Sequence, residues 1–343
     1  MSFEELKEIL SGIGQPKYRA EQVFSALQSG KRVDEISNIP NDLKVHLKEN
    51  YESNILEIVK TQTSSDGTKK FLYKLCDGNL IEGVLMEYKF GYTLCVSTQV
   101  GCRMHCAFCA SGIDGLVRNL SSGEILSQVV FVNKLLGGDL KERKVTNIVL
   151  MGSGEPLDNY DNVCKFLELA TDKHGLNFSE RNISLSTCGL VPKIRELADS
   201  KFNINICLSL HAPNDNIRRQ IMPIAQGFSV KELMEAMRYY FEKTNRRILI
   251  EYILIDNVNS SVKEARELAR LTKGLNCIVN LINLNEVKEN NFKRCSPEVS
   301  QAFFDELKHE KVNVTMRRSL GHDIDGACGQ LRRKVIKQEK ERK

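Results

Sequence analysis

The chain has 343 residues and a formal net charge of +5, with 41% hydrophobic and 27% charged residues. This length suffices for one large domain or two unequal ones, and the composition excludes an intrinsically disordered chain. No apolar run approaches the roughly 18 residues of a membrane-spanning helix, so we expect no membrane association.

Eleven cysteines are the feature of the composition that most needs an explanation. The first ten residues carry three glutamates in an amphipathic pattern, which is not the pattern of a secretory signal peptide. We therefore expect a cytoplasmic protein whose cysteines are reduced thiols, metal ligands or catalytic groups.

Three amphipathic helices are predicted first, at residues 3–13, 19–28 and 42–51, because apolar residues recur there at three- and four-residue spacing. Three strands follow at 55–62, 69–76 and 80–88, separated by the turn compositions SSDG and CDGN. We expect a small helical accessory domain over residues 1–52 and a β-hairpin extension over residues 53–90.

Beyond residue 90, short β-branched runs alternate with helical ones. Strands are expected at 93–98, 145–151, 182–187, 204–210, 248–255 and 277–283, and helices at 122–136, 159–171, 190–199, 230–243, 261–273 and 297–310. Six βα units predict an α/β fold with parallel strands, because parallel pairs need long connections. Their number favours a barrel or part of one over a doubly wound sheet, although periodicity alone does not decide. The active site should lie beyond the C-terminal ends of the strands.

We assign residues 91–311 to this core and residues 312–343, with one more strand at 312–317, to a C-terminal extension. The last twelve residues carry seven basic and two acidic side chains, an excess that equals the net charge of the whole chain. Such a tail suits a polyanion such as RNA, since each neutralised phosphate releases counterions. A frayed, solvated terminus would explain the same charges.

Three cysteines with C-x3-C-x2-C spacing, Cys102, Cys106 and Cys109, follow the first strand of the core. Their thiolates can converge on one metal centre from a single loop. Zinc would need a fourth ligand, here His105, although structural zinc sites usually have paired CxxC spacing. A [4Fe–4S] cluster on three cysteines would leave one iron open to a small molecule, as a catalytic site requires.

The C-x3-C-x2-C loop resembles the signature of the radical S-adenosylmethionine (SAM) superfamily. The resemblance implies a partial (β/α)6 barrel, a [4Fe–4S] cluster on the three cysteines, and SAM bound to the open iron. In the string GSGEPLDNYDNV, Gly154 and Glu155 match the motif that meets the amino group of SAM. Residues at the ends of later strands would supply further SAM contacts, or merely cap neighbouring helices: Ser186, Ser209, Leu210, His211 and Asn285.

Three further strings narrow the resemblance: QVGC before the loop, CASGIDGLVRNLSSGEI from Cys109 onward, and RRSLGHDIDGACGQL at 317–331. Together with the helical N-terminal segment, they resemble the RlmN/Cfr family of RNA methyltransferases along essentially the whole chain. That family's chemistry implies an S-methylcysteine at Cys328, a proton acceptor at Glu82 and a resolving thiol at Cys95. Without the resemblance, Glu82 would be read as a solvated strand carboxylate and Cys95 as a packed core cysteine.

The resemblance also implies the reaction and its partners. These are methylation of adenine C2 in 23S rRNA, in the peptidyl-transferase region, and in tRNA, next to the anticodon. Two SAM would be consumed per methyl, an external donor such as flavodoxin would supply electrons, and we expect a monomer. One alternative is a Cfr-like C8 methyltransferase that confers ribosomal antibiotic resistance; another is a zinc-stabilised RNA-binding module without catalysis. GEPLDNYDNV favours the C2 branch, while Ser153 and Gly326 depart from the family's usual Met and Ala.

Overall fold

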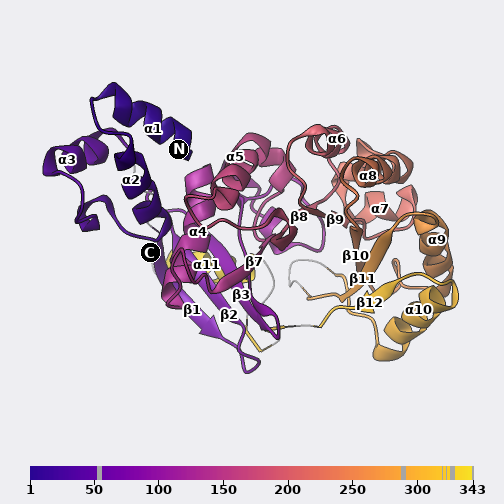
Figure 1. The fold of residues 1–343 in the computed structure, drawn as a ribbon. Helices are drawn as coiled ribbons and strands as arrows, with labels where there is room; N and C mark the ends of the chain where they lie inside the picture. The colour runs from indigo at the N-terminus through magenta and orange to yellow at the C-terminus, as the bar shows by residue number, and fades with distance from the viewer. Residues whose placement is uncertain (52–55, 287–290, 319, 322, 325–328, 342–343) are drawn as a thin grey trace.

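The computed structural model describes the chain apart from residues 52–55, 287–290, 319, 322, 325–328 and 342–343 (Figure 1). Three helices come first, α1 (Phe3–Gly12), α2 (Tyr18–Gln28) and α3 (Asn41–Asn50), each within one residue of its predicted bounds. Their apolar sides pack into a hydrophobic cluster of their own, which includes Leu6 and Val23. The accessory segment therefore has its own small core beside the main one.

The described strands of the main sheet follow the order β1-β2-β3-β4-β7-β8-β9-β10-β11-β12. Strands β1 to β4 pair antiparallel, and β4 and all later strands of this sheet are parallel. Because β1 and β12 are the two edges of the sheet as described, the parallel units do not close into a full barrel. The order of βα units agrees with the predicted α/β fold. The strands are β1 (Glu57–Thr63), β2 (Lys69–Lys74), β3 (Leu80–Tyr88), β4 (Gly91–Cys95), β7 (Val145–Leu150), β8 (Ile183–Thr187), β9 (Asn205–Ser209), β10 (Ile248–Leu254), β11 (Cys277–Asn283) and β12 (Val314–Met316).

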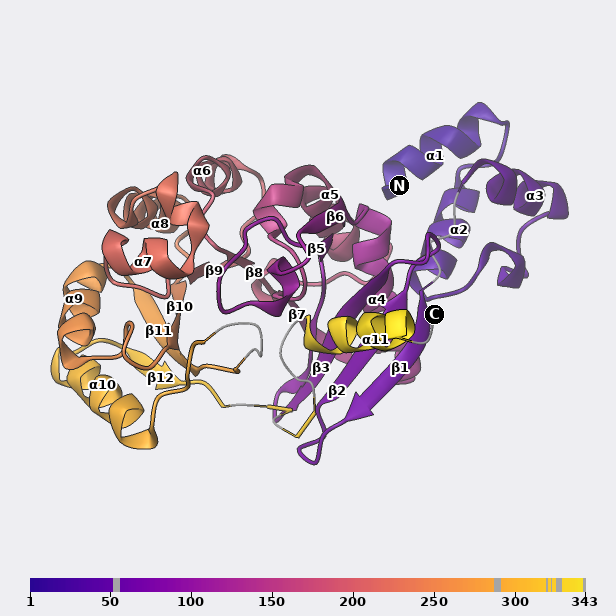
Figure 2. The same ribbon diagram turned by 180° about the vertical axis from the view of Figure 1, so that it is seen from behind.

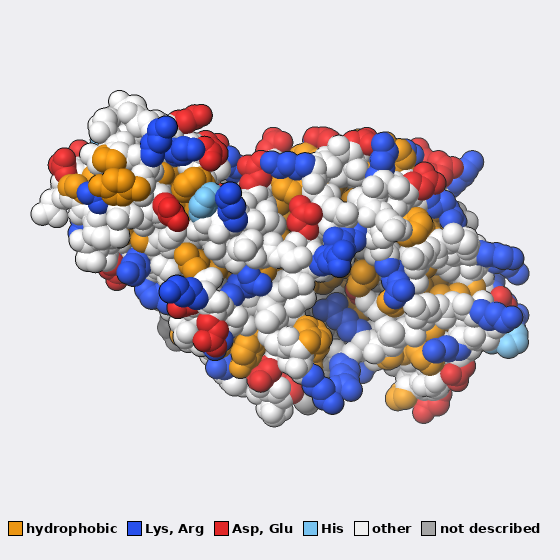
Figure 3. Space-filling view, viewed as in Figure 1, with side chains coloured by type: hydrophobic (Ala, Val, Ile, Leu, Met, Phe, Trp, Pro, Cys, Tyr) orange, Lys and Arg blue, Asp and Glu red, His pale blue; other side chains and the backbone are white. Residues whose placement is uncertain are grey.

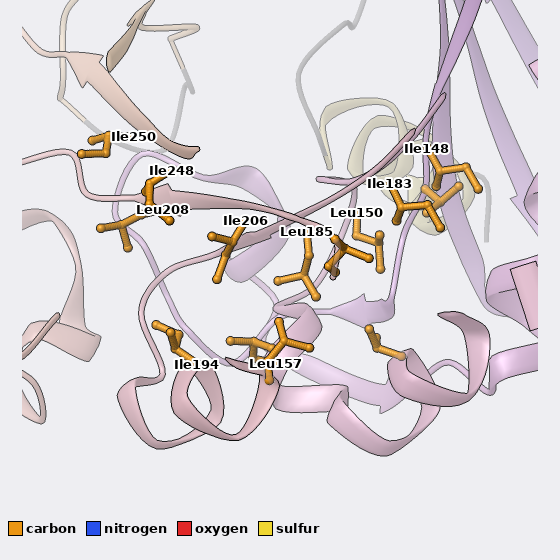
Figure 4. Close-up of a cluster of buried hydrophobic side chains, with 14 of the residues drawn as sticks. Ile148, Leu150, Leu157, Ile183, Leu185, Ile194, Ile206, Leu208, Ile248 and Ile250 are labelled. Carbon is orange, nitrogen blue, oxygen red and sulfur yellow. The ribbon is translucent and has the colours of Figure 1, made fainter. Parts of the chain in front are cut away.

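Helices cover the outer face of the parallel strands (Figure 1, Figure 2). Alternate strand residues point to this face and build the core, in which aliphatic side chains of β7 to β10 meet Leu157 and Ile194 (Figure 4). No helix in the described part of the chain is long and apolar enough to cross a membrane. The covering helices are α4 (Ser122–Leu135), α5 (Tyr160–Thr171), α6 (Val191–Asp199), α8 (Val230–Thr244), α9 (Val262–Thr272) and α10 (Pro297–His309).

Some short elements near the cysteine loop were not expected from the sequence. Strands β5 (Gln99–Gly101) and β6 (Leu116–Asn119) form a separate antiparallel pair, and helix α7 (Asp215–Ile221) follows β9. They are too short for a hydrophobic period to be visible. The frame of the loop thus comes partly from elements that pattern analysis does not detect.

The basic tail forms helix α11 (Gln330–Glu341), so the alternative of a frayed terminus is wrong for these residues. Leu331 is fully buried in a small apolar cluster with Leu72 of β2 and Leu80 of β3, and Val335 and Ile336 pack on the same cluster. Figure 2 shows α11 lying across the antiparallel strands β1 to β3. The apolar side of the helix therefore packs on the sheet, although most residues of the segment are charged.

Candidate metal centre and active site

The cysteine loop leaves the carboxyl end of β4, the first parallel strand, where the sequence predicted it. At its base, where β5 and β6 pair, the amide of Cys102 donates to the carbonyl of Gly115 at 3.0 Å. On its other side, the amide of Ala107 donates to the carbonyl of Ile221 at the end of α7, at 2.9 Å. Backbone hydrogen bonds thus hold the loop from two sides.

The sulfurs of Cys102, Cys106 and Cys109 do not all lie within 4.8 Å of one another. Two thiolates bound to one zinc at 2.3 Å in tetrahedral geometry would lie about 3.8 Å apart. Among the described residues, three metal-binding side chains bring their ligand atoms within 4.8 Å of one another only in a surface group on α10. The cysteine loop forms no such group, with or without His105. A four-iron cluster takes one thiolate per iron, so it accepts ligands that are farther apart.

Burial disfavours the thiolate form of these cysteines. It raises the pKa of Cys102 to about 12, and the carboxylate of Glu155 and the sulfur of Cys109 add to the rise. Burial also raises the pKa of Cys106 well above its usual value, with Cys109 and Cys102 as the next causes. Thiolates therefore form here only when positive charge compensates them, and iron would supply that charge.

Glu155 lies just beyond β7, and its carboxylate accepts the N–H of Cys188 at 2.8 Å and that of Leu157 at 3.1 Å. Burial raises the pKa of Glu155, so an ammonium group beside it would favour the ionised form. Gly154 has a φ of +112°, and a Cβ there would lie 2.7 Å from the Cβ of Gln99. Gly154 thus allows the close approach to β5 that brings Glu155 to the cysteine loop.

Polar side chains form a row across the inner face of the parallel strands. The hydroxyl groups of Ser186 and Ser209 lie 3.3 Å apart and share a hydrogen bond. Glu251 of β10 stands next to Ser209 in register and accepts from Nδ2 of Asn280 at 3.1 Å. Sequence analysis missed Glu251 and Asn280, although each interrupts an apolar run and could have been singled out for that reason.

Three other predicted SAM contacts lie in different surroundings. Nδ1 of His211 accepts the N–H of Ile253 at 3.1 Å, and its ring packs edge to face on Phe108 of the cysteine loop at 4.9 Å between centroids. Burial lowers the pKa of His211 to about 3, so the ring is neutral near pH 7. Leu210 is fully buried, whereas Asn285 is exposed beyond β11.

Glu82 lies on the inner face of β3 and is only 2% exposed, so it is not a solvated strand carboxylate. Its carboxylate lies 3.0 Å from Nζ of Lys70 on β2, and Lys70 is fully buried. The same carboxylate accepts the N–H groups of Gly329 and Arg332, each at 2.6 Å. Glu82 therefore caps the N-terminus of α11, where negative charge is favourable.

Cys95 ends β4 and is 6% exposed. It stands opposite Val84 of β3, two residues after Glu82, so Cys95 and Glu82 face the same side of the sheet. The predicted proton acceptor and resolving thiol thus share the inner face.

Cys328 lies outside the described residues, but Gly329 after it and Gly321 before it are described. Gly329 packs on the cysteine loop, since a Cβ there would lie 2.7 Å from the amide nitrogen of Ser111. Before Cys328, the amide of Gly321 donates at 2.8 Å to Asp66 in the turn between β1 and β2. The chain therefore passes the cysteine loop immediately after Cys328.

Positive charge gathers at one opening of the molecule. Figure 3 shows a hollow between the β1–β3 side and the β10–β12 side, with Lys and Arg side chains in and around it. Helix α11, which lies in front of the sheet in the reverse view of Figure 2, also exposes Lys334 and Lys337, while its Arg333 pairs with Asp114 at 3.3 Å. Such a surface is complementary to a phosphate backbone.

Comparisons with known proteins give full-length matches. A model of the radical SAM superfamily matches residues 96–269. The chain is 49% identical over 339 residues to the probable dual-specificity RNA methyltransferase RlmN of Clostridium novyi, covering 98% of this chain and 97% of that protein. It is 50% identical over 339 residues to the protein of the same name from Clostridium perfringens, covering 98% and 96%. A solved radical SAM methyltransferase from Sphaerobacter thermophilus matches with a TM-score of 0.91 and 41% identity, covering 96% of this chain and 97% of that one.

Proposed function

Because the chain belongs to the RlmN family of dual-specificity RNA methyltransferases within the radical SAM superfamily, we propose that it methylates C2 of adenine in 23S rRNA and in tRNA. Members of this superfamily use a [4Fe–4S] cluster and SAM. The observation that supports the proposal most is the packing of Gly329, which adjoins Cys328, against the cysteine loop while its amide is bound by Glu82.

Cys102, Cys106 and Cys109 would hold the cluster, leaving one iron for SAM. When bound, the cluster supplies the electron that cleaves SAM to a 5′-deoxyadenosyl radical. Glu155, whose burial favours a cationic neighbour, would bind the amino group of SAM, and Gly154 leaves the backbone room to approach. The other proposed SAM contacts are Ser186, Ser209, Leu210, His211 and Asn285, with Leu210 acting through its backbone because its side chain is buried.

The methyl group would travel through the protein, because C2 of adenine is electrophilic and cannot displace the methyl group of SAM directly. Cys328 would take the methyl from one SAM as S-methylcysteine. The 5′-deoxyadenosyl radical from a second SAM would abstract a hydrogen atom from this methyl group, and the methylene radical left on Cys328 would bond to C2. Glu82 would accept the C2 proton, and the unpaired electron of the adduct would return to the cluster. Cys95 would then attack the sulfur of Cys328, the released carbon would take up a proton to become the methyl group, and a reductant would reopen the Cys95–Cys328 disulfide.

The surroundings of Glu82 suit the role of proton acceptor. The polar contacts of its carboxylate that the structure describes, with Lys70 and with the amides of Gly329 and Arg332, are all with donors, which is the arrangement of an ionised carboxylate. An ionised carboxylate is the form that can accept a proton. Its buried position beside α11 would also keep water from competing with the RNA.

The remaining parts of the proposal concern partners. The Lys and Arg side chains around the hollow in Figure 3 would contact RNA phosphates. An external donor such as flavodoxin would supply electrons, and the enzyme would act as a cytoplasmic monomer.

Nucleoside analysis tests the proposed reaction. Anaerobically reconstituted protein is incubated with SAM, a reductant and an RNA hairpin of the target sequence, and the digested RNA is analysed by mass spectrometry against both methyladenosine isomers. We expect 2-methyladenosine. The C8 isomer would instead assign the Cfr-like activity, and a colourless zinc protein without any methyladenosine would favour the RNA-binding module.

A further inference from the structure

Arg218 of α7 is a fully buried cation that forms no ion pair with any described residue. Its Nε donates to the carbonyl of Leu210 at 3.1 Å, and its Nη2 donates to the carbonyls of Cys188 at 2.5 Å and Ser209 at 3.4 Å. Its Nη1 is buried without a hydrogen-bond partner in the described structure. Burying an arginine in this way is unfavourable unless a negative group nearby compensates its charge.

The cysteine loop packs directly on the helix that carries Arg218. Cys102 and Cys106 belong to the apolar cluster that contains Ile217 and Ile221 of α7, on either side of Arg218 in the sequence. The amide of Ala107 donates to the carbonyl of Ile221, one turn after Arg218. The helix that carries Arg218 is therefore in direct contact with the loop.

The charged and ionisable groups around Arg218 are few in the part of the chain that the structure describes. Burial lowers the pKa of Arg218, and the groups that oppose this are, in order, Cys188, Cys106 and Asp215. Asp215 is already engaged, because its carboxylate accepts the N–H of Val230 at 2.7 Å. Cys188 lies outside the three-cysteine loop, so Cys106 is the one of these two sulfurs that would become a thiolate by binding a metal centre.

We propose that Arg218 is a positioning residue that compensates the negative charge of the cluster and its three thiolates, and so raises the reduction potential of the cluster. This proposal rests on the proposed function for the presence of the cluster. Three thiolates outweigh the charge of the cluster core, and reduction adds one more negative charge, which a nearby cation stabilises. Arg218 acts through its charge, since its buried guanidinium has no surface to offer to SAM or RNA.

Redox titration of the full-length, anaerobically reconstituted protein tests this, with iron content measured in the same samples. In Arg218→Gln, we expect the ratio of reduced to oxidised cluster at a fixed potential to fall at least tenfold, which is 59 mV for a one-electron couple. In Arg218→Lys, which keeps the charge, we expect the ratio to stay within about threefold of the wild-type value. Arg246→Gln is the matched control, because Arg246 also donates to a carbonyl, that of Asn203, but lies before β10 at the opposite end of the sheet.

Two results would overturn the inference. One is an unchanged potential in Arg218→Gln, and the other is a tenfold fall in Arg218→Lys, which would assign the effect to lost hydrogen bonds instead of lost charge. If circular dichroism shows that Arg218→Gln does not fold, the redox titration of Arg218→Lys alone tests the inference. A wild-type protein that binds no iron would contradict the proposed function instead, so the two failures are distinguishable.

Discussion

Lys70 and Glu82 form a buried ion pair, with 3.0 Å between the ammonium nitrogen and the carboxylate. The same carboxylate accepts the amides of Gly329 and Arg332, so the pair joins the β2–β3 hairpin to α11. Two hydrogen bonds thus connect the proposed proton acceptor to the segment that follows Cys328.

Glu82→Gln should lower the free energy of unfolding by about 3–5 kcal/mol, because the buried ammonium group of Lys70 would lose the carboxylate 3.0 Å away. Urea unfolding followed by circular dichroism measures this. The double variant Lys70→Met/Glu82→Gln removes the buried ammonium group as well and should recover most of the loss. Equal stabilities of the single and double variants would show that the loss of stability does not come from the buried charge of Lys70.

Cys95→Ala should accumulate protein that is covalently linked to RNA, since no thiol remains to open the thioether at Cys328. A nuclease-sensitive shift of the protein band on a denaturing gel reports this product. Cys76→Ala is the control, because Cys76 is exposed and has no assigned role. Repeated turnover by Cys95→Ala would remove Cys95 from the mechanism.

Cys328→Ala should form neither methyladenosine nor linked RNA, while SAM is still cleaved to 5′-deoxyadenosine. The cleavage of SAM persists because it depends on the cysteine loop and not on Cys328. Chromatography of the small-molecule products, beside the nucleoside analysis, separates the two activities. Methylated RNA from this variant would contradict the S-methylcysteine route.

His211 should make the fold sensitive to acid. Burial, and to a lesser extent the charge of Arg218, lowers the pKa of His211 from 6.5 to about 3, so the unfolded chain binds this proton more readily than the folded one. The resulting stability is present above pH 6.5 and is lost as the pH falls toward 3. Between pH 7 and 4, the wild type should lose on the order of 3 kcal/mol more than His211→Asn, which keeps an acceptor for Ile253 but does not titrate. If the free energies of unfolding of the wild type and of His211→Asn, measured in urea, fell equally between pH 7 and pH 4, His211 would not be the source of the acid sensitivity.

Gly154→Ala should destabilise the protein by roughly 1–3 kcal/mol, because the new Cβ would meet Gln99 and the backbone has a φ of +112°. Gly12→Ala at the end of α1 is the control, since a Cβ there meets nothing within 4 Å. Thermal unfolding of both variants, without ligands, measures the difference. If both alanines were tolerated equally, the close approach at Gly154 would not be needed for folding.

Most of the fold could be predicted because its helices are long and amphipathic. Helix α4, for example, was expected at residues 122–136 and spans Ser122–Leu135, with Ser121 and Glu124 forming a capping box. The short elements β5, β6 and α7 escaped prediction because three to seven residues carry no clear period. Helix α11 escaped because its apolar side is narrow and most of its residues are charged.

The site could be predicted in part. The cysteine spacing and the strand order were sufficient to locate the loop at the carboxyl end of β4. Lys70 and Arg218 could not be found in this way, because their burial depends on contacts with segments distant in the sequence. In the strand KKFLYK, nothing local distinguishes the buried Lys70 from its exposed neighbour Lys69. The roles of Glu82, Cys95 and the SAM contacts, and the domain boundaries, remain predictions.

The central claim is that Cys102, Cys106 and Cys109 hold a four-iron cluster whose remaining iron is open to SAM. Electron paramagnetic resonance of the reduced, anaerobically reconstituted protein, recorded before and after addition of SAM, tests it most directly. We predict the signal of one [4Fe–4S] cluster that changes when SAM is added and that is lost in Cys106→Ala. A cluster signal that SAM leaves unchanged, or a protein that holds zinc and gives no signal, would contradict the claim.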